Sequence, residues 1–516
     1  MDFAVDNINN NHIYLLIVWC VAAMLSGCGQ QSSEVCTDIT PEPQEAAPEM
    51  LPDTVFASTE AVRWRVDTIS DLPGTLDCVA DMYADAPGVL TFRANSFRDG
   101  GDPGVLDSVP TGIVTDWRFV TGEDYTLTDY GRWGGGTGWT GQPLLVDRKN
   151  SRNPSAEVIV GSLCGKVYFI DFATGGDSRP AIDAGNPVKG TVSLDPVITG
   201  NLYVGHGVPV REPFGAAVVD LESHKIGHMT DRDSSAWRGW GAYDSSPLRV
   251  GQFLLRPGEN GTLYKYVAER GTLRLHSSLR YSVGGAAPGV EASMSAYRNY
   301  GYLSDNHGNI LCVNLNNLHP VWHYALGDDS DATPVVTEEG GGVYLYVGCE
   351  IDRRGKGAAR IAKLNALTGQ PVWVTATEGR RVESEGKHFD GGYYATPLPG
   401  RGDCSHLLFA NCVLNTDTVR RNGVFQAIDR RDGHIAYTRD LGYYSWSSPV
   451  GMIDPDGCYY VVTADCSGTV HLLRGIDGKE IDRRHVGMNF ESSPAVRGNK
   501  LLIGSRGNSI YKLSIE

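Results

Sequence analysis

Short apolar runs recur along most of the chain, and polar turns that contain Gly, Asn or Asp separate them. One phrase is clearest at residues 244–247, 446–449 and 491–494: two small residues and a proline, followed by an apolar run and a glycine-containing turn. A phrase that returns at intervals of roughly 50 residues is typical of proteins assembled from one repeated supersecondary unit. We therefore expect the chain to consist of copies of a single β-unit.

Each unit is expected to contain four short strands, named A to D. The apolar runs are short and rich in Val, Ile, Leu and Tyr, which favours strands over helices. By this pattern the units begin at 142–146, 193–196, 244–247, 291–294, 331–334, 394–397, 446–449 and 491–494.

The eighth unit stops after its strand C and has no strand D. Residues 114–120 precede the first strand A and have the form of a strand D, like residues 321–324. An N-terminal strand that completes the last sheet would close a ring and leave no open edge. The sequence therefore predicts an all-β fold over residues 113–516, an eight-bladed β-propeller of four-stranded blades.

The composition agrees with strands and turns, because the 516 residues include 63 Gly and 24 Tyr. The formal net charge is −16 at pH 7, from 61 acidic and 45 basic residues. Phosphate binding needs clustered Lys and Arg, so this balance argues against a nucleic-acid partner. An acidic surface also serves solubility alone.

The N-terminus has the pattern of an export signal. An apolar run at 13–23 is too short to cross a bilayer and suits the central region of a signal peptide. Residues 25–28, Leu-Ser-Gly-Cys, resemble a bacterial lipobox, in which the cysteine is lipidated. Residues 1–11 lack the Lys or Arg that such signals usually carry. An ordinary secretory peptide that contains a cysteine is the alternative.

These features predict a signal peptide at 1–27 and lipid attachment at Cys28. The Pro- and Glu-rich segment 28–54 cannot bury a core and is expected to be a disordered tether. Residues 55–112 are an N-terminal extension and lead-in, with a strand expected within 55–67 and a short helix at 78–85. We expect the protein in a bacterial cell envelope, lipid-anchored to the outer membrane and facing the periplasm.

The cysteines and histidines carry no recognisable metal or redox motif. None of the eleven cysteines forms a C-x-x-C pair, which gives no support to a zinc, thioredoxin-like or haem site. The nine that follow Cys28 serve either as small buried hydrophobes or as pairs between neighbouring repeats. No H-E-x-x-H spacing and no G-x-S-x-G elbow occurs, and no catalytic residue and no metal ligand is assigned.

The clearest C–D corner reads Lys-Leu-Asn-Ala-Leu-Thr-Gly-Gln-Pro-Val-Trp at residues 363–373. It is similar to the tryptophan-docking repeat of the PQQ-like (quinoprotein alcohol dehydrogenase-like) β-propellers. Trp117 and Trp322 take the place of Trp373 in other units, and residues 91–100 resemble a lead-in found before such propellers. The resemblance implies that Thr and Gly form the turn and that each Trp packs against the next blade.

The same resemblance leaves a choice of functions. Dehydrogenases of this superfamily hold pyrroloquinoline quinone (PQQ) and Ca²⁺ over the central channel, and some have two adjacent cysteines there. This chain has no adjacent cysteines, and no calcium-binding Glu/Asn/Asp set can be matched. It resembles lipoprotein members without a cofactor, such as the propeller subunit of the outer-membrane β-barrel assembly machinery, although its N-terminal region and loops are longer.

One mouth of the channel is the best place to expect a ligand. The residue three positions before the proline of strand A, or before its equivalent, is acidic or aromatic in six units: Asp244, Glu291, Asp331, Tyr394, Trp446 and Glu491. Asp195 lies close to this position, and Trp139 ends a glycine-rich stretch at 133–139. Such a mouth could bind a cation, a basic peptide or a sugar. The alternative is that these residues cap local turns.

Together these observations predict a membrane-anchored lipoprotein whose propeller is a non-enzymatic scaffold for an envelope protein or a small ligand, without a resident cofactor. One alternative is a quinoprotein dehydrogenase that binds PQQ and Ca²⁺ over the channel. A second alternative is a glycan-binding propeller.

Overall fold

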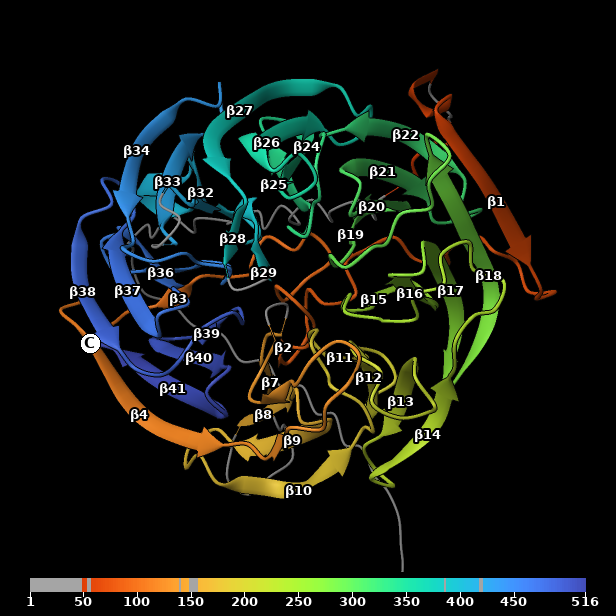
Figure 1. Ribbon diagram of the computed structural model, residues 1–516, viewed down its shortest axis with the longest axis horizontal. Helices are drawn as coiled ribbons and strands as arrows, with labels where there is room; N and C mark the ends of the chain where they lie inside the picture. Colours follow the sequence, from red (N-terminus) through yellow and green to blue (C-terminus); the bar gives the residue numbers. More distant parts are fainter. Residues whose placement is uncertain (1–48, 53–56, 139–140, 148–155, 385–386, 417–420) are drawn as a thin grey trace, which may run out of the picture. The chain divides into compact units, whose positions relative to one another are not determined.

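The computed structural model describes residues 49–52, 57–138, 141–147, 156–384, 387–416 and 421–516, all within the unit Pro48–Glu516. Their regular structure is strand, apart from two single-turn 3-10 helices, Ala57–Thr59 and Gly402–Cys404. Eight larger sheets are set around a common centre like the blades of a propeller (Figure 1). The expected all-β, eight-bladed fold is confirmed.

Blades 1 to 4 follow one another along the chain, each from an inner strand A to an outer strand D. Blade 1 contains β7 (Leu144–Asp147), β8 (Ala156–Gly161), β9 (Lys166–Asp171) and β10 (Asp177–Asp183). Blade 2 contains β11 (Ser193–Leu194), β12 (Asn201–Gly205), β13 (Ala216–Asp220) and β14 (Lys225–Thr230). Blade 3 contains β15 (Leu248–Val250), β16 (Phe253–Gly258), β17 (Thr262–Glu269) and β18 (Thr272–Val283). Blade 4 contains β19 (Ser295–Tyr297), β20 (Tyr300–Ser304), β21 (Asn309–Asn314) and β22 (Pro320–Ala325).

Blades 5 to 7 repeat the plan with small additions. Blade 5 contains β23 (Val335–Glu339), β24 (Gly342–Gly348), β26 (Lys356–Asn365) and β27 (Pro371–Arg380). Blade 6 contains β31 (Leu398–Pro399), β32 (Leu407–Val413), β33 (Gly423–Asp429) and β34 (Ile435–Asp440), extended by β30 (Gly391–Gly392) and β25 (Glu350–Ile351). Blade 7 contains β35 (Val450–Ile453), β36 (Tyr459–Ala464), β37 (Thr469–Arg474) and β38 (Glu480–His485). Two separate hairpins are β5 (Glu123–Asp124) with β6 (Gly134–Gly135), and β28 (Val382–Ser384) with β29 (Lys387–Phe389).

The last blade is completed by an N-terminal strand. Its own strands are β39 (Ala495–Arg497), β40 (Lys500–Ser505) and β41 (Ser509–Ile515). The fourth is β4 (Ile113–Val120), which pairs antiparallel with β41 and places Phe119 opposite Ile510. The closure predicted for residues 114–120 is therefore confirmed.

The middle strands of the blades are the most buried. Every residue of β21, β33 and β36 is buried, because neighbouring blades cover both faces of these strands. Strands covered on both faces appear in the sequence as continuous apolar runs rather than as alternating patterns. The outer strands β34 and β38 are largely exposed.

The small–small–Pro phrase also links the blades at the centre of the ring. The residue in its last small position is Ser or Thr, and its hydroxyl accepts a hydrogen bond from the backbone N–H of the preceding blade. These bonds, of 2.9 to 3.2 Å, run in sequence from Ser246 to Ser293, Thr333, Thr396, Ser448 and Ser493. The repeated phrase is thus a contact between units as well as a turn.

The tryptophan corners dock as the resemblance implied. Trp322 Nε1 donates to the carbonyl of Ala366 at 2.9 Å, and Trp373 Nε1 donates to that of Arg430 at 3.0 Å. Trp117 makes the equivalent bond to Phe172 at 3.0 Å. Each indole therefore fixes the outer strand of one blade to the C–D corner of the next.

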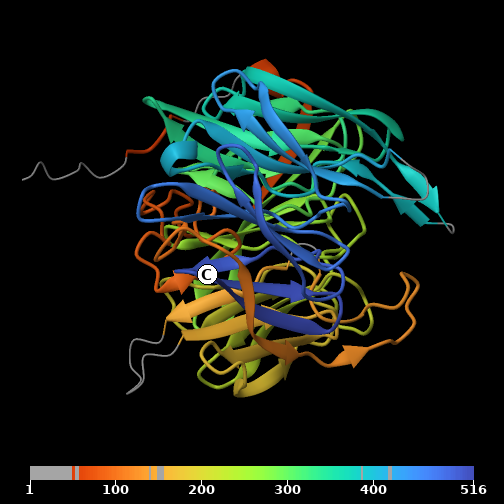
Figure 2. The same cartoon turned by 90° about the vertical axis from the view of Figure 1, so that its left-hand side faces the viewer.

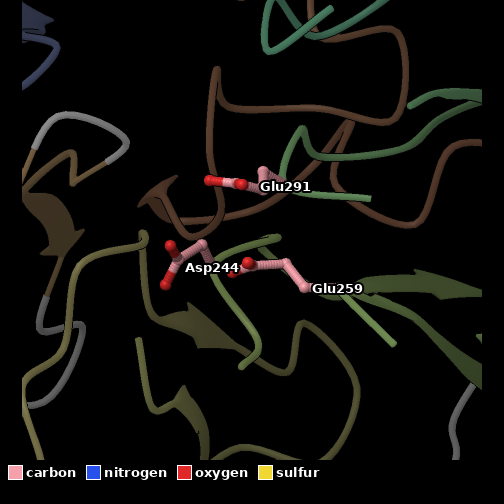
Figure 3. A group of neighbouring side chains, drawn as sticks. All are labelled: Asp244, Glu259 and Glu291. Atoms are coloured by element: carbon pink, nitrogen blue, oxygen red, sulfur yellow. The ribbon is translucent and has the colours of Figure 1, made fainter. Parts of the chain in front are cut away.

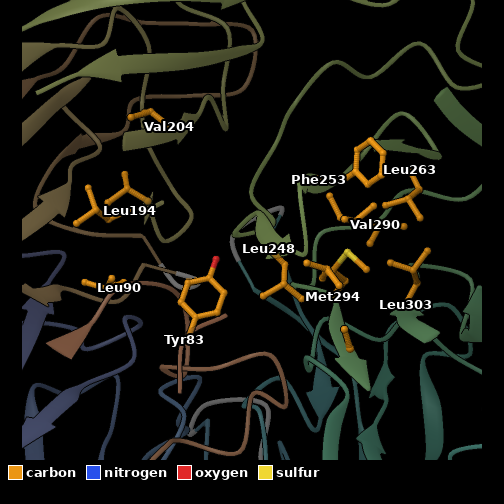
Figure 4. Close-up of a cluster of buried hydrophobic side chains, with 14 of the residues drawn as sticks. Tyr83, Leu90, Leu194, Val204, Leu248, Phe253, Leu263, Val290, Met294 and Leu303 are labelled. Carbon is orange, nitrogen blue, oxygen red and sulfur yellow. The ribbon is translucent and has the colours of Figure 1, made fainter. Parts of the chain in front are cut away.

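The extension before the propeller adds strands to several blades. β1 (Val62–Thr68) is a fifth strand on the outer edge of blade 3, where it pairs with β18. Figure 4 shows Tyr83 and Leu90 of this segment among core side chains of blades 2 to 4. The expected strand within 55–67 is present over a slightly later range. The expected helix at 78–85 is wrong, because this segment forms turns that place Val79 and Tyr83 in the core.

The lead-in crosses the centre of the ring. β2 (Gly88–Val89) pairs with β7 of blade 1, and β3 (Gly104–Val105) pairs in parallel with β35 of blade 7. Between them, backbone N–H groups of Leu194, Ala296 and Val336 donate to lead-in carbonyls at 2.8 to 2.9 Å. The lead-in thus supplies hydrogen-bond partners to inner strands that would otherwise end at an open channel.

Two buried arginines hold this plug in place. Arg93 donates to the carbonyls of Pro449 at 2.7 Å and Pro397 at 3.1 Å, and Arg98 donates to Met294 at 2.9 Å and Ser246 at 3.2 Å. Both side chains are almost completely buried, and burial lowers the pKa of each guanidinium group to about 10. They remain cationic at neutral pH and join carbonyls from four blades.

The unit has two distinct faces. Figure 2 shows the orange-brown lead-in on one side and the cyan hairpin β28–β29 on the opposite side.

All eight cysteines of the described part are free thiols, so no disulfide joins neighbouring blades there. No helix within the described residues is long and apolar enough to cross a membrane.

Candidate cation-binding site at the channel mouth

Three carboxylates form a first group, here named the lower cup, between blades 2, 3 and 4. Asp244, Glu259 and Glu291 each place an oxygen within 4.8 Å of the other two (Figure 3). Asp244 precedes β15, Glu259 directly follows β16, and Glu291 precedes β19. Strands of two blades therefore deliver the three side chains to one point.

The lower cup already holds a cation of the protein. Lys189 Nζ pairs with Asp244 and lies 3.9 Å from Glu291 Oε2. Gly207 leaves room for the lysine stem, since a Cβ at that position would lie 2.5 Å from Lys189 Cδ. Burial lowers the pKa of Lys189, but Asp244, Glu291 and Glu259 outweigh burial and raise the pKa above its ordinary value.

A second group, here named the upper cup, lies between blades 4, 5 and 6. Asp329, Asp331 and Glu350 also place one oxygen each within 4.8 Å of the others. Glu350 lies on β25, and its N–H donates to the carbonyl of Asp329 at 2.7 Å. A Cβ on Gly392 of the paired strand β30 would lie 2.6 Å from Glu350 Cα, so glycine there permits the close pairing that fixes Glu350.

The upper cup differs from the lower one in its charge balance. No ion pair within the described part of the chain involves Asp329, Asp331 or Glu350. Glu350 is only 2% exposed, and its Oε1 and Asp329 Oδ1 are buried without a hydrogen-bond partner among the described residues. Burial, followed by the neighbouring carboxylates, raises the pKa of all three groups well above the ordinary values. A group of buried carboxyls of this kind is compensated either by protonation or by a bound cation.

An aromatic wall adjoins the upper cup. The rings of Tyr394 and Trp446 are stacked with centroids 4.9 Å apart, and Tyr444 lies edge-on to Trp446 at 5.4 Å. Tyr394 lies close enough to Glu350 and Asp331 for their charges to raise its pKa, after the larger effect of burial. The mouth thus combines carboxylates with aromatic faces.

The remaining predicted residues lie in different places. Glu491 accepts a hydrogen bond from Asn489 at 2.7 Å and lies 3.4 Å from Arg506, at the same mouth but outside both cups. Asp195 is not at this mouth: it caps the A–B turn of blade 2 and pairs with Arg249 at 3.2 Å. Trp139 lies outside the described residues.

Four residues of the two cups were not singled out from the sequence. Lys189 and Asp329 lie in connections between blades, whereas Glu259 and Glu350 follow a strand B closely. A weak signal existed, because the B–C connection faces the same mouth as the start of strand A. Glu259 is the first residue after its strand B and Glu350 is the second, so an acidic residue within two positions of the end of strand B was that signal.

Two cavities of the unit lie near the centre of the ring, one at the channel and one at the lead-in. A cavity of about 10 Å³ lies below the mouth, between Asp331, Tyr394, Trp446 and Phe92 of the lead-in. A larger one, of about 540 Å³, lies on the lead-in face and includes Arg93, Arg401 and Arg497 in its lining. None of the predicted site residues lines the larger cavity. The cavity below the mouth has space for about one water.

Comparisons with solved structures support the fold. A quinohemoprotein alcohol dehydrogenase from Pseudomonas putida HK5 aligns with a TM-score of 0.58 and 11% identity, over 86% of this chain and 83% of its own. A europium-containing methanol dehydrogenase aligns with a TM-score of 0.55 and 13% identity, over 84% and 99%. BamB from Moraxella catarrhalis has a TM-score of 0.48 and 15% identity, over 78% and 98%. No family model and no curated protein matches the sequence.

The first two similarities confirm the propeller fold that the repeats predicted, and they raise the question whether the mouth fits PQQ. PQQ is a flat tricyclic quinone with three carboxylates, so it needs a wide slot and several cationic donors. The cavity here is about 10 Å³, against several hundred Å³ for a typical cofactor site. The mouth is lined by carboxylates, and Lys189 already pairs with two of them. The described residues therefore fit a cation and do not fit this anionic cofactor.

Proposed function

We propose that the protein is an envelope lipoprotein, anchored through Cys28, whose propeller is a non-enzymatic scaffold that binds a cationic ligand or a basic segment of a partner. The observation that carries this proposal is the excess of buried carboxylates over cations at the channel mouth. Both cups contain three carboxylates, and only the lower one contains a protein cation, Lys189, among the described residues. A site with this charge attracts and retains positive groups.

The shape of the ring supports a scaffold rather than a catalyst. The lead-in plugs the channel with Arg93 and Arg98, so the mouth is a closed cup and not a passage for substrates. The blades are fixed to one another by the tryptophan corners and the hydroxyl ring. Rigid blades that present ligand-binding loops at one end are a common arrangement for recognition.

The mouth is also able to hold a metal ion. Carboxylate oxygens are the ligands that Ca²⁺ and Mg²⁺ prefer, and the upper cup offers three without a protein cation. In the dehydrogenase alternative such an ion would work together with PQQ, which the lining of this mouth does not accommodate.

Two measurements test the proposal. Equilibrium dialysis of the purified protein with PQQ and Ca²⁺ at high micromolar concentration should show no stoichiometric PQQ binding, and no alcohol or sugar should drive dye reduction. Stoichiometric binding together with substrate-dependent dye reduction would replace the scaffold by a dehydrogenase.

The anchor is tested separately in cells. Metabolic labelling with a fatty-acid analogue should mark the wild-type protein, and Cys28→Ser should abolish the label and release the protein from the membrane fraction. Cys78→Ser is the control, since Cys78 is an exposed thiol outside the proposed signal. Unlabelled wild-type protein in the soluble fraction would contradict lipid anchoring.

A further inference from the structure

We infer that the upper cup is a subsite for a primary alkylammonium group, supplied by a lysine side chain of a partner protein or by a free polyamine. This inference rests on the proposed function, in which the channel mouth is a binding surface, and names the chemistry of the group that it takes.

The first argument is that the protein already binds an alkylammonium in the equivalent arrangement. In the lower cup, the ammonium of Lys189 meets Asp244 and Glu291, and it lies 5.9 Å from the centroid of the Trp133 ring. The lysine side chain is only 11% exposed. Three carboxylates and an aromatic ring are thus sufficient in this scaffold to hold one buried ammonium group.

The upper cup repeats this arrangement without the lysine. It also has three carboxylates with oxygens within 4.8 Å of one another, and an aromatic wall in which Tyr394 is stacked on Trp446. The unpartnered Glu350 Oε1 belongs to a side chain that is 98% buried and lies among the other two carboxylates. A buried charged oxygen without a hydrogen-bond partner destabilises the folded protein, so a ligand that donates a hydrogen bond to it removes this unfavourable free energy on binding.

The chemistry of the cup favours an ammonium over a divalent metal ion. A primary ammonium group has three N–H donors, which match three carboxylates, whereas Ca²⁺ requires six to eight oxygen ligands. Aromatic faces attract organic cations through their electron-rich surfaces and offer no ligand to a metal ion. The combination with Tyr394 and Trp446 is therefore the environment of a lysine head group.

The burial of the three carboxylates also gives the direction of entry. Asp329 and Asp331 are partly exposed, whereas Glu350 is buried. A ligand would pass the two aspartates and place its charged end at Glu350, with its alkyl stem against the aromatic wall. This is how long cationic side chains are usually accommodated, with the stem on apolar surface.

The test uses the purified full chain and isothermal titration calorimetry at pH 7.5 without PQQ. The probes are spermidine, a lysine-containing tripeptide with blocked ends, and Ca²⁺. We expect saturable binding of one amine per chain, and Glu350→Gln should weaken it at least tenfold. Glu378→Gln, an exposed glutamate on β27 of the same region, is the matched control and should leave the affinity unchanged. Tighter binding of the peptide would assign a protein lysine as the source, and tighter binding of spermidine a polyamine.

A second variant keeps the inference testable if Glu350→Gln fails to fold. Lys189→Met removes the resident ammonium from the lower cup, so the chain should then bind two amines instead of one. The inference is overturned if neither amine binds at millimolar concentration, or if Ca²⁺ alone binds and loses affinity in Glu350→Gln. Dye reduction with PQQ would contradict the proposed function without bearing on the amine titration, so the two failures are distinguishable.

Discussion

The indole of Trp322 lies directly against Gly369 of the following blade: a Cβ on Gly369 would be 2.6 Å from Trp322 Cδ2. The same relationship joins Trp117 to Gly175 and Trp373 to Gly433, with separations of 2.7 and 2.8 Å. Each of these glycines has a positive φ: 72° for Gly369, 74° for Gly175 and 79° for Gly433. The corner glycine is therefore required by the turn and by the docked ring at once.

Gly369→Ala should lower the free energy of unfolding by roughly 2–5 kcal/mol, because it strains the left-handed turn and displaces a fully buried indole. The measurement is urea denaturation followed by tryptophan fluorescence. Gly355→Ala is the control: its φ is 69°, but no atom lies within 4 Å of the new Cβ. It should cost only about 1 kcal/mol, the strain of the backbone. Equal losses in the two variants would show that the indole contact contributes nothing.

These corners show how far local patterns predict the structure. The Thr-Gly turn and the Trp are only a few residues apart, so the sequence predicted both and the docking of Trp322 on the next blade. The corresponding contact of blade 6 was not predicted, because Tyr437 replaces Trp there and lies against Gly478. The tyrosine ring makes the same contact with the corner glycine as the tryptophan rings do, but a search for Trp does not find it.

Removal of residues 509–516 deletes β41, leaves β4 without its partner and opens the ring. We expect loss of the cooperative thermal transition, since an open propeller exposes two unpaired sheet edges. The measurement is calorimetry of the purified chain. Its control is a chain that begins at residue 70 and lacks β1, an outer fifth strand of blade 3. That variant should still melt cooperatively, and a cooperative melt after loss of β41 would refute the role of closure.

The lead-in was found in the sequence, but its function as a plug was not. Its arginines contact carbonyls that lie far away in the chain, 356 residues for Arg93 and Pro449 and 304 for Arg93 and Pro397. No local pattern encodes such partners, because the ring geometry alone brings the inner strands together. From the sequence alone, a segment with two arginines therefore indicates a polar, exposed loop and not the centre of a ring.

Arg93→Met should lower the free energy of unfolding by roughly 3 kcal/mol or more, because it leaves the carbonyls of Pro397, Pro449 and Arg98 buried without a donor. Denaturant unfolding monitored by circular dichroism measures the effect. Arg65→Met, at a side chain that is 69% exposed, should stay within about 0.5 kcal/mol of the wild type. A similar result for both arginines would mean that the plug does not stabilise the ring.

The carboxylates at the channel mouth were predicted only in part, because only some of them have a fixed position in the repeat. Asp244, Glu291 and Asp331 keep a fixed distance from the proline phrase, so the repeat pattern located them. Lys189 lies in a connection between blades and Glu350 follows a strand B, so neither keeps the fixed distance from the proline phrase that located the other carboxylates. Asp195 is adjacent to a proline as well, but it belongs to the opposite end of strand A and caps a turn.

The charge state of the upper cup predicts how stability depends on pH. Burial, then Asp331 and Asp329, raise the pKa of Glu350 well above 4.5, its value in an unfolded chain. Below pH 4.5 both states are protonated and the group has no effect. As pH rises from 4.5 towards the folded pKa, only the unfolded state loses its proton, so the wild type becomes less stable.

Glu350→Gln removes this loss, because the amide cannot ionise and keeps the shape of the side chain. We expect the variant to melt a few degrees higher than the wild type at pH 7, corresponding to roughly 1–3 kcal/mol, and at the same temperature at pH 4.5. Thermal scans from pH 4.5 to 8 measure the difference. Millimolar spermidine should raise the melting temperature of the wild type at pH 7 and have little effect on the variant, because the ammonium compensates the charge that the variant lacks. A variant that is less stable than the wild type by the same amount at both pH values would show that Glu350 is not held as a strained carboxyl group.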